Sequence, residues 1–289
     1  MVYLSRLEVT EKYLNDVRAF APQAMIIYDT VDLHHLREIR EAKLKNSVQL
    51  YEKAMETKRR ELALMNYVDC TLVVSQLEKR LLEREQPDLK NIEFFPMPRE
   101  IYGAAQNFAE RQNMVFIGGF EHPPNVDAVL YFVQEIFPRV KQAIGQLKFF
   151  VIGNKAPQEI LDLATEDVVI AGYVPELGEY FNHCKLSVAP LRYGAGIKGK
   201  ILTSCCYGLP VVATPIAVEG MGLQDGHDVL VGDTAERFAQ QVIEVYRDEG
   251  LWTRISQNSL ATVASRYSME AVTGQFGQLL NRLRATAAK

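Results

Sequence analysis

The second half of the chain alternates short, wholly apolar runs with amphipathic stretches, and this alternation constrains its fold most strongly. The runs have the length and composition of strands: Met114–Ile117, Leu147–Ile152, Asp167–Ile170, Lys185–Ala189, Pro210–Ala213 and Asp228–Leu230. The stretches between them, such as Asn125–Lys141 and Thr234–Asp248, place apolar residues at helical spacing. Strands that are apolar on both faces and alternate with helices predict a parallel sheet covered on both sides.

Glycine-containing turns directly follow several of these expected strands, at Gly118-Gly119, Gly153, Gly172 and Gly194–Gly196. Right-handed connections between parallel strands give a doubly wound, Rossmann-like α/β domain. Ligands of such sheets bind at the carboxyl ends of the strands. We therefore expect these turns to line one crevice.

The segment Pro190–Leu202 carries the most specific chemistry of the chain. Its glycines, Gly194 and Gly196, let the backbone approach a ligand closely, and the helix expected after them offers free N–H groups and the positive end of its dipole. Three cations accompany them: Arg192, Lys198 and Lys200. Lysines at a helix start oppose the dipole, so a structural role alone explains them poorly. The pattern favours a diphosphate site over the alternative, a solvated turn.

The composition of the chain limits the kinds of partner that it is expected to bind. The chain has 36 acidic and 32 basic residues, a formal net charge of −4, which argues against sequence-independent nucleic-acid binding. Its apolar runs are shorter than the roughly 18 residues of a membrane helix, and its start lacks a signal-peptide pattern. We therefore expect a cytoplasmic protein, and a peripheral contact with a membrane stays open.

The four cysteines lack metal-ligand spacing and are interpreted as buried thiols, with a regulatory disulfide as the alternative: Cys70, Cys184, Cys205 and Cys206.

The first half has fewer strand-like runs and more charge. Strands are expected at Met25–Tyr28, Cys70–Val74 and Ile92–Phe95, with Met1–Ser5 as a further candidate. A highly charged helical segment, roughly Leu36 to Asn66, lies between the first two, and its mixed signs are typical of a solvated helix face.

A linker is expected between the two halves. Pro96, Pro98 and the polar segment Gly103–Asn113 have the composition of a connecting loop. Before them, Ser75-x-x-Glu78 has the pattern of a capping box that opens a helix. We expect a partial N-terminal domain with linker at residues 1–112 and a second Rossmann-like domain at residues 113–289. The first domain has too few strands for a complete doubly wound fold; it is either incomplete or a short accessory layer.

In its second half the chain resembles the retaining glycosyltransferases of family 4, the group 1 transferases. The stretches that carry the resemblance are Phe116–Phe120 with Pro124–Val129, Ala171–Val174, Pro190–Thr214 and Val218–Met221. Residues 27–34 of the first half are similar to an acceptor-domain strand that faces the cleft. The resemblance implies the GT-B fold, an α/β arrangement of two facing Rossmann-like domains, with the first incomplete in this chain. It also implies a last helix, at about 268–284, that crosses back to the first domain; packing on its own domain is the alternative.

The same resemblance implies a function. A sugar would pass from a nucleotide diphosphate sugar to a glycan or lipid-linked acceptor with retention of configuration, and without a metal or other cofactor. The protein would stabilise the charge that grows on the leaving diphosphate and hold both substrates together. Of the two lysines, one is expected to point away, because positions two apart do not share a helix face. The positions assigned to the donor are Gly118, Gly119, Gly172, Tyr173, Val174, Arg192, Gly194, Gly196, Lys198, Lys200 and Thr203.

Three residues are candidates for catalysis. Glu219 resembles a carboxylate that contacts sugar hydroxyls or ribose, and a plain loop glutamate is the alternative. Asp32 and His34 would orient the acceptor or the reacting sugar at the end of a strand, whereas Asp32 equally fits a helix N-cap. Asp29 is a second candidate for the carboxylate that faces the cleft, and His122 is interpreted as a loop residue.

Two departures from the family pattern keep other functions open. Members often carry a Glu-x7-Glu pair, but the matching positions here are Ala195 and Thr203, so the hydroxyl of Thr203 would have to replace a carboxylate at the ribose. The sequence at the start also lacks the glycine-bearing strand and turn of full members. The alternatives are a non-catalytic nucleotide-sugar-binding or partner module and a GT-B enzyme of another kind, such as an epimerase. A dehydrogenase is disfavoured because no Gly-x-Gly-x-x-Gly follows a first strand.

Overall fold

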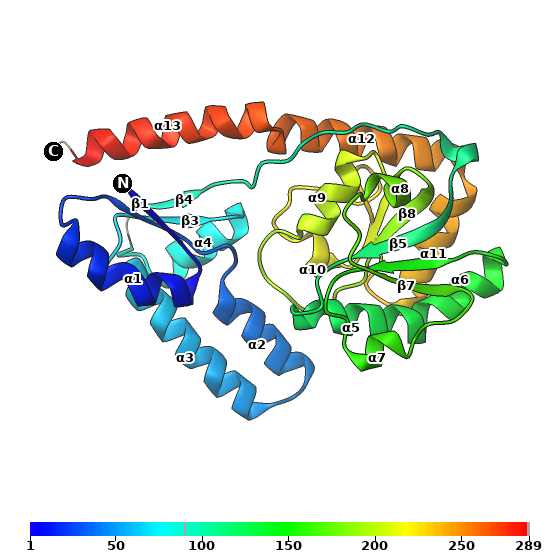
Figure 1. Cartoon of the computed structure of the whole chain (residues 1–289), viewed down its shortest axis with the longest axis horizontal. Coiled ribbons are helices and arrows are strands. Elements are labelled where there is room, and N and C mark those ends of the chain that lie inside the picture. Colours follow the sequence, from blue (N-terminus) through cyan, green and yellow to red (C-terminus); the bar gives the residue numbers. More distant parts are fainter. Residues whose placement is uncertain (90, 288–289) are drawn as a thin grey trace.

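The chain forms two parallel β-sheets that lie in separate parts of the molecule (Figure 1). The computed structural model describes residues 1–89 and 91–287. The first sheet has the strand order β1-β2-β3-β4, and the second has the order β10-β9-β8-β5-β6-β7. The first sheet with helices α1 to α4 is called the N-terminal lobe below, and the second sheet with α5 to α12 is called the C-terminal lobe. The α/β fold with parallel sheets that the sequence predicts is confirmed.

The N-terminal lobe contains all four strands expected in the first half. Its elements are β1 (Val2–Ser5), α1 (Leu7–Phe20), β2 (Ile26–Asp29), α2 (His34–Leu44), α3 (Val48–Met65), β3 (Cys70–Val73), α4 (Gln76–Glu85) and β4 (Ile92–Phe94). Successive residues of β2 face opposite sides of the sheet. Ile26 and Tyr28 pack toward the helices that connect the strands, while Ile27 packs toward α13. The strand order follows the chain order without reversal, which is the arrangement of one half of a doubly wound sheet.

The charged segment between Leu36 and Asn66 forms two helices rather than one. Asn46, with φ of 48°, leaves the right-handed helical region and ends α2. The side chain of Ser47 then accepts a hydrogen bond from the backbone N–H of Leu50, 3.3 Å away, and so caps the start of α3. An asparagine in the left-handed region followed by a serine N-cap is a local stop and restart signal.

The C-terminal lobe reverses its strand order between β5 and β8, so its switch point lies there. Its strands are β5 (Gln112–Ile117), β6 (Phe149–Ile152), β7 (Val168–Gly172), β8 (Cys184–Ala189), β9 (Val211–Ala213) and β10 (Leu230–Val231). Its helices are the 3-10 turn η1 (Phe108–Glu110), α5 (Pro123–Tyr131), the π-helical turn η2 (Phe132–Ile136), α6 (Phe137–Ile144), α7 (Gln158–Leu161), α8 (Gly178–Phe181), α9 (Gly199–Cys206), α10 (Pro215–Val218), α11 (Ala235–Arg247) and α12 (Glu249–Tyr267). Every residue of β8 is buried, as expected for a central parallel strand with helices on both faces.

Two segments connect the lobes. Residues 95–107 run past α9, where the backbone N–H groups of Tyr102 and Gly103 both donate to the carbonyl of Cys206 over 3.0 Å. The fully buried Arg111 then donates through Nη1 to the carbonyl of Phe181 at 2.6 Å. This part of the predicted linker is therefore packed into the C-terminal lobe. Where the chain divides into independent domains stays a prediction.

The second connection is α13 (Met269–Ala287), drawn in red in Figure 1, which extends from the end of α12 over the first sheet. Its Leu279 and Leu283 pack with Ile27 and Leu72 of that sheet. No helix among the described residues is long and apolar enough to span a bilayer. All four cysteines are buried free thiols.

Candidate functional site

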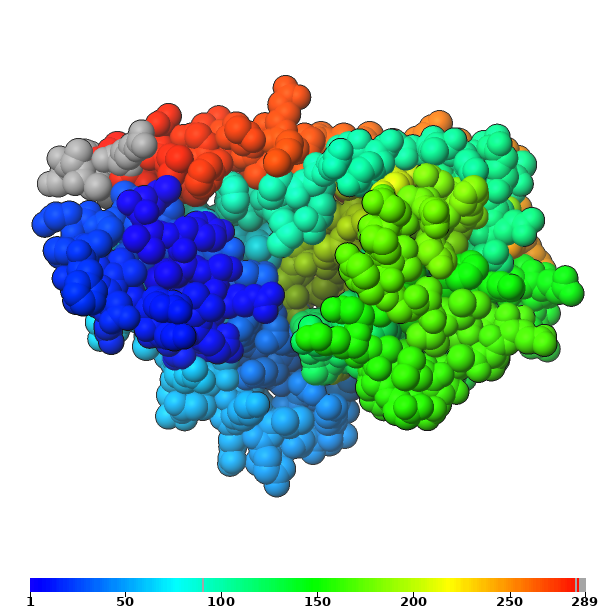
Figure 2. Space-filling view, viewed as in Figure 1, coloured from blue at the N-terminus to red at the C-terminus, as the bar shows by residue number. Residues whose placement is uncertain are grey.

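A cavity of about 470 Å³ lies between the lobes, at the carboxyl ends of β5 and β8 where the second sheet reverses its order. Figure 2 shows the molecule hollowed between its N-terminal half, in blue, and its second half, in green. The N-terminal lobe contributes Arg6, Glu8, Val31, Asp32, His34 and Arg37 to the lining. The C-terminal lobe contributes Glu121, His122, Pro123, Asn125, Leu191, Ala195, Ile197, Lys198, Gly199 and Lys200. The glycine turns after β5 and β8 lie here, in the crevice where doubly wound sheets bind ligands.

Two lysine ammonium groups lie in this cavity, and neither forms an ion pair with a carboxylate of the described residues. Nζ of Lys198 donates to the backbone carbonyls of Ala195 at 2.9 Å and Gly196 at 2.6 Å. Nζ of Lys200 donates to Oδ1 of Asn125 and lies 4.1 Å from the centre of the Phe116 ring. Burial lowers the pKa of Lys198 to about 8 and that of Lys200 to about 7, the latter with a further contribution from the charge of Lys198.

Both lysines line the cavity, so the expectation that one of them points away is wrong. Lys198 is the residue before α9 and has an extended backbone, with φ of −84° and ψ of 93°. The rule that positions two apart lie on different helix faces therefore does not apply to this pair. The cavity holds two cations near the start of a helix whose first N–H groups have no intrahelical partner.

The turn between β8 and α9 is held by the N-terminal lobe. The carbonyl of Gly194 accepts from Nη1 of Arg40 at 2.6 Å, and the N–H of Gly196 donates to Oε1 of Glu78 at 3.1 Å. Gly196 has φ of 66°, and a Cβ added to it would lie 2.8 Å from Cβ of Asp32. Glycine is required at this position by both its backbone conformation and the close approach of the other lobe.

Glu78 contacts the Gly194–Gly196 turn, although nothing in the sequence predicted this contact. Ser75 accepts from the N–H of Glu78 at 3.1 Å, as the predicted capping box requires. The carboxylate does not return to Ser75. It accepts instead from Leu33 at 3.3 Å and from Gly196, while its Oε2 has no partner among the described residues. Burial raises the pKa of Glu78 to about 7. The pattern Ser-x-x-Glu is the same whether the glutamate closes the capping box or binds another segment. The sequence therefore could not show that Glu78 contacts the Gly194–Gly196 turn.

Asp32 and His34, predicted as catalytic, both line the cavity. Nη1 of Arg37 forms an ion pair with Asp32, whose Oδ1 lies 3.4 Å from Nε2 of His34. The N-cap alternative for Asp32 is wrong, because Glu61 from α3 accepts the N–H groups of His34 at 2.9 Å and His35 at 3.0 Å.

Asp29, the alternative carboxylate, is directed elsewhere. Its Oδ2 accepts from the hydroxyl of Tyr3 at 2.7 Å, and its Oδ1 accepts from the N–H of Val31 at 3.0 Å. It is not among the residues that line the cavity. Asp32 is therefore the aspartate of this strand end that faces the crevice.

Two backbone outliers border the same cavity. Arg6 has φ of 74° and Val31 has φ of 63°. Positive φ is uncommon for residues with a Cβ and is a genuine outlier for a branched one such as valine. Each such residue costs on the order of 1–3 kcal/mol and persists where its surroundings fix it. Their N–H groups are anchored on Asp29, Arg6 on its carbonyl at 2.9 Å and Val31 on its carboxylate.

Several predicted donor residues lie outside the lining. Nε of Arg192 donates to Oδ2 of Asp127 at 3.0 Å, and the exposed guanidinium lies 5.0 Å from the centre of the Tyr131 ring. The hydroxyl of Thr203 donates back to the carbonyl of Gly199, 2.9 Å away and within the same helix. Neither side chain points into the cavity, because each has a nearer partner on its own lobe.

The other predicted residues that do not line the cavity are Gly118, Gly119, Gly172, Tyr173, Val174, Gly194, Gly196 and Glu219. Gly172 ends β7 and is followed by Tyr173, which is 75% exposed, and by Val174. Glu219 lies beyond the Gly194 turn and forms an ion pair with Arg40, with 2.7 Å between Nη1 and Oε2. Its predicted contact with sugar hydroxyls or ribose and the alternative of a plain loop glutamate both stay predictions.

Gly118 and Gly119 shape the floor without lining it. A Cβ at Gly118 would lie 2.7 Å from Nδ2 of Asn125 and 2.8 Å from Nζ of Lys200. Nδ2 of Asn125 donates to the carbonyl of Gly119 at 2.7 Å, which fixes the amide so that its oxygen faces Lys200. Asn125 thus positions this lysine, a role that only the spatial structure reveals.

His122 and Arg37 are further residues that the sequence analysis did not assign to the site. His122 was expected to be a loop residue, but it lines the cavity at the start of α5, and burial lowers its pKa to about 4. An uncharged imidazole is a hydrogen-bonding group for hydroxyls rather than a cation. Within the described residues, no group of three or more His, Cys, Asp or Glu side chains is arranged to hold a metal ion.

Residues 111–248 match the sequence model of the family described as "Glycosyl transferases group 1". This similarity supports a group 1 glycosyltransferase domain in the matched part of the chain. It includes the turns after β5 and β8 and both cavity lysines.

Two curated proteins are similar over parts of this chain. An uncharacterised 44.6 kDa protein in the cps region of Klebsiella pneumoniae is 22% identical over 169 residues, which is 55% of this chain and 44% of that protein. The lipopolysaccharide core biosynthesis glycosyltransferase LpsE of Rhizobium meliloti (strain 1021) is 34% identical over 82 residues, 28% of this chain and 24% of LpsE. The chain therefore spans less than half the length of these relatives.

Solved structures with the GT-B fold align with almost the whole chain. Sucrose-phosphate synthase from Thermosynechococcus elongatus gives a TM-score of 0.78 at 17% identity, over 98% of this chain and 73% of that one. Anabaena HepE in complex with UDP and glucose gives a TM-score of 0.74 at 13% identity, over 97% and 78%. These neighbours establish the GT-B arrangement of two Rossmann-like units for this chain.

Proposed function

We propose that the chain is a glycosyltransferase that takes a sugar from a nucleotide diphosphate sugar, with the diphosphate bound at Lys198 and Lys200. The observation that carries the proposal is the pair of desolvated ammonium groups, which contact only neutral oxygens of the described residues. Buried charges in proteins are normally paired. A diphosphate supplies the missing negative charge, and charge-assisted hydrogen bonds to it are the strong kind.

The same cations would act on the reaction. When the bond between the sugar and the diphosphate breaks, negative charge grows on the leaving phosphate oxygen. Two ammonium groups held in place by carbonyl and amide oxygens stabilise this charge without having to reorganise. The two ammonium groups would neutralise the charge on the diphosphate, as a metal ion does in other enzymes. This supports the proposal of a metal-independent reaction.

The N-terminal lobe would hold the acceptor side of the reaction. Asp32 is fixed between Arg37 and His34 and faces the lysines across the cavity. In this position it would orient a sugar hydroxyl by accepting a hydrogen bond.

We propose retention of configuration, with the leaving phosphate accepting the acceptor proton, because the family resemblance implies this course. A precursor of a surface polysaccharide is the proposed acceptor class, in keeping with the names of the curated relatives.

The competing proposal is a binding module without turnover. Its support is that Ala195 and Thr203 stand where many family members have glutamates, and that Glu219 is engaged by Arg40. An epimerase is the third possibility within the same fold. Incubation with nucleotide sugars separates them: transfer to acceptor or slow hydrolysis supports the enzyme, conversion of the free donor supports an epimerase, and binding alone supports the module.

Calorimetry with UDP, ADP and GDP tests the donor site directly. Lys200→Met keeps the length and removes the charge, and it should weaken binding of the best nucleotide by roughly tenfold or more, the size of a charge-assisted contact. Lys53→Met, at an exposed lysine of α3, is the matched control. If both variants bind as the unmodified protein does, the diphosphate does not lie at Lys200.

A further inference from the structure

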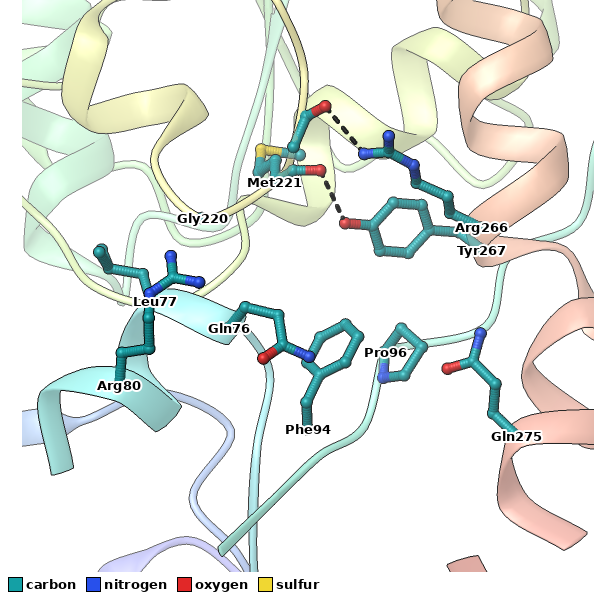
Figure 3. Close-up of a pocket in the computed structure, with 11 residues that line it drawn as sticks. Gln76, Leu77, Arg80, Phe94, Pro96, Gly220, Met221, Arg266, Tyr267 and Gln275 are labelled. Carbon is teal, nitrogen blue, oxygen red and sulfur yellow. Dashed lines mark hydrogen bonds between the residues drawn. The ribbon is translucent and has the colours of Figure 1, made fainter. Parts of the chain in front are cut away.

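A second hollow follows α4 on the other side of the Gly194 turn. It consists of two adjoining cavities of about 400 and 440 Å³ that share Leu77 and Arg80. We call this hollow the α4 groove. Figure 3 shows the end of the groove near the junction of α12 and α13, which we call the hinge end. Arg80 from α4 lies on one side of it and Arg266 from the end of α12 on the other.

Two arginine side chains of the α4 groove form no contact with an acidic residue that the structure describes. Arg80 and Arg84 are exposed, lie four residues apart on α4, and form no ion pair or hydrogen bond with any residue that the structure describes. Like charges at this spacing destabilise a helix. Two carboxylates of the same helix are engaged by lysines, Glu85 by Lys58 at 2.5 Å and Glu83 by Lys79 at 4.0 Å. The two arginines are thus available to an external anion.

Arg266 adds a third guanidinium at the hinge end. Its Nη1 donates to the carbonyl of Gly222 at 2.8 Å, a neutral partner that leaves its charge unbalanced. The hydroxyl of Tyr267 donates to the neighbouring carbonyl of Met221 at 3.1 Å, as the dashed lines in Figure 3 show. The two contacts fix the loop that forms this wall of the groove.

Between the cations the groove is apolar. Its lining side chains without charge include Leu36, Leu77, Leu81, Phe94, Pro96 and Met221. An anion alone would leave this surface uncovered, and a neutral chain alone would leave the arginines unpaired. The combination fits a molecule that has both a negative group and a hydrocarbon segment.

The groove ends beside the cavity proposed for the donor. Arg40 and Glu219 line its inner end and form an ion pair there. Arg40 also donates to the carbonyl of Gly194, whose chain neighbour Ala195 lines the donor cavity. Arg40 and the Gly194–Gly196 turn therefore lie between the groove and the donor cavity.

We propose that the α4 groove binds the acceptor, and that this acceptor carries a phosphate group on an apolar chain, placed between Arg80, Arg84 and the leucines of α2 and α4. The assignment of the ligand as acceptor rests on the proposed function. The binding of a phosphorylated amphiphile to the groove does not, so the two can fail separately.

Calorimetry with decyl phosphate, kept below its micelle concentration, tests the groove. Binding should weaken about tenfold or more in the double variant Arg80→Gln/Arg84→Gln, because two charge-assisted contacts are lost. The matched control is Arg254→Gln, an exposed arginine of α12 without a partner among the described residues. Thermal unfolding followed by circular dichroism shows whether each variant is folded.

The ligand series separates the parts of the proposal. Affinity should rise from butyl to decyl phosphate, and decyl glucoside, which lacks the charge, should bind at least about tenfold more weakly. Equal binding of decyl phosphate by the double variant and the control overturns the groove, as does equal binding of inorganic phosphate and decyl phosphate. Normal decyl phosphate binding together with no UDP binding retains the groove and removes the proposed function.

Discussion

Donor binding at the two buried lysines should depend steeply on pH. Without a ligand, burial holds the pKa of Lys198 at about 8 and that of Lys200 at about 7, compared with about 10.4 in water. A diphosphate stabilises the charged form of both groups, so it raises each pKa when it binds. Above pH 7 the protein must therefore take up protons on binding, and its affinity must fall as the pH rises.

The size of this effect follows from the two values. A group that binds a ligand only as its cation weakens the affinity by the factor 1 + 10^(pH − pKa). Between about pH 7.5 and about pH 9.5, Lys200 alone gives a loss of about eightyfold, and Lys198 adds to it. The nucleotide itself contributes little, because a phosphate monoester has its second pKa near 6 and is already ionised throughout this range.

Isothermal titration calorimetry with UDP, or with the base that binds best, measures both quantities. Two buffers of different ionisation enthalpy at each pH give the number of protons taken up. Lys200→Met should bind more weakly at pH 7.5 and show a flatter profile, whereas Lys53→Met should follow the unmodified protein. An affinity that stays constant from pH 7.5 to pH 9.5, or a release of protons, would refute the placement of the diphosphate at these lysines.

Four further predictions concern the contacts around the cavity. Glu78→Gln should stabilise the protein by about 2–3 kcal/mol at pH 8 but not at pH 5. The pKa of this carboxyl is raised in the folded state, so its ionisation costs stability only above about pH 5. Equal changes of the melting temperature at both pH values would contradict this. Gly196→Ala should lower the melting temperature and weaken UDP binding, while Gly274→Ala in α13, where a Cβ meets open space, should not. Arg40→Met should increase the radius of gyration in solution scattering, because it removes contacts between the lobes at Gly194 and Glu219; an unchanged radius means that other contacts suffice. Arg192→Gln should change UDP affinity by less than about threefold, since that guanidinium pairs with Asp127; a tenfold loss would return it to the donor site.

The architecture of the second sheet was predictable from local patterns. Each of its strands is a short apolar run, and the glycine turns after β5 and β8 mark the edge at which its order reverses. The predicted strand at Asp228–Leu230 is displaced, because β10 is Leu230–Val231. Short edge strands are set by pairing with a neighbour rather than by their own composition.

The side chains of the site were only partly predictable. Lys198 and Lys200 could be assigned because they follow a glycine turn at a helix start, which is a local arrangement. Arg192 belongs to the same segment, yet its long side chain reaches Asp127 on α5. Glu78 and Arg40 reach the Gly194–Gly196 turn from more than a hundred residues away. Contacts of this kind depend on how the two lobes meet, and no spacing within either segment records it.

The contacts of Glu78 also give it a part in the response to a donor. Its carboxyl interacts electrostatically with Lys198 and binds the N–H of Gly196, so it lies on the same turn as the proposed diphosphate site. Negative charge brought to Lys198 should raise the pKa of this carboxyl further, and at about pH 7 it should then accept a proton. Proton uptake near neutral pH would thus come from Glu78 together with Lys200, and uptake above pH 8 from the lysines. Glu78→Gln should therefore reduce the proton uptake near pH 7 and leave the uptake above pH 8 unchanged, and equal uptake by the variant and the unmodified protein at pH 7 would contradict this role of Glu78.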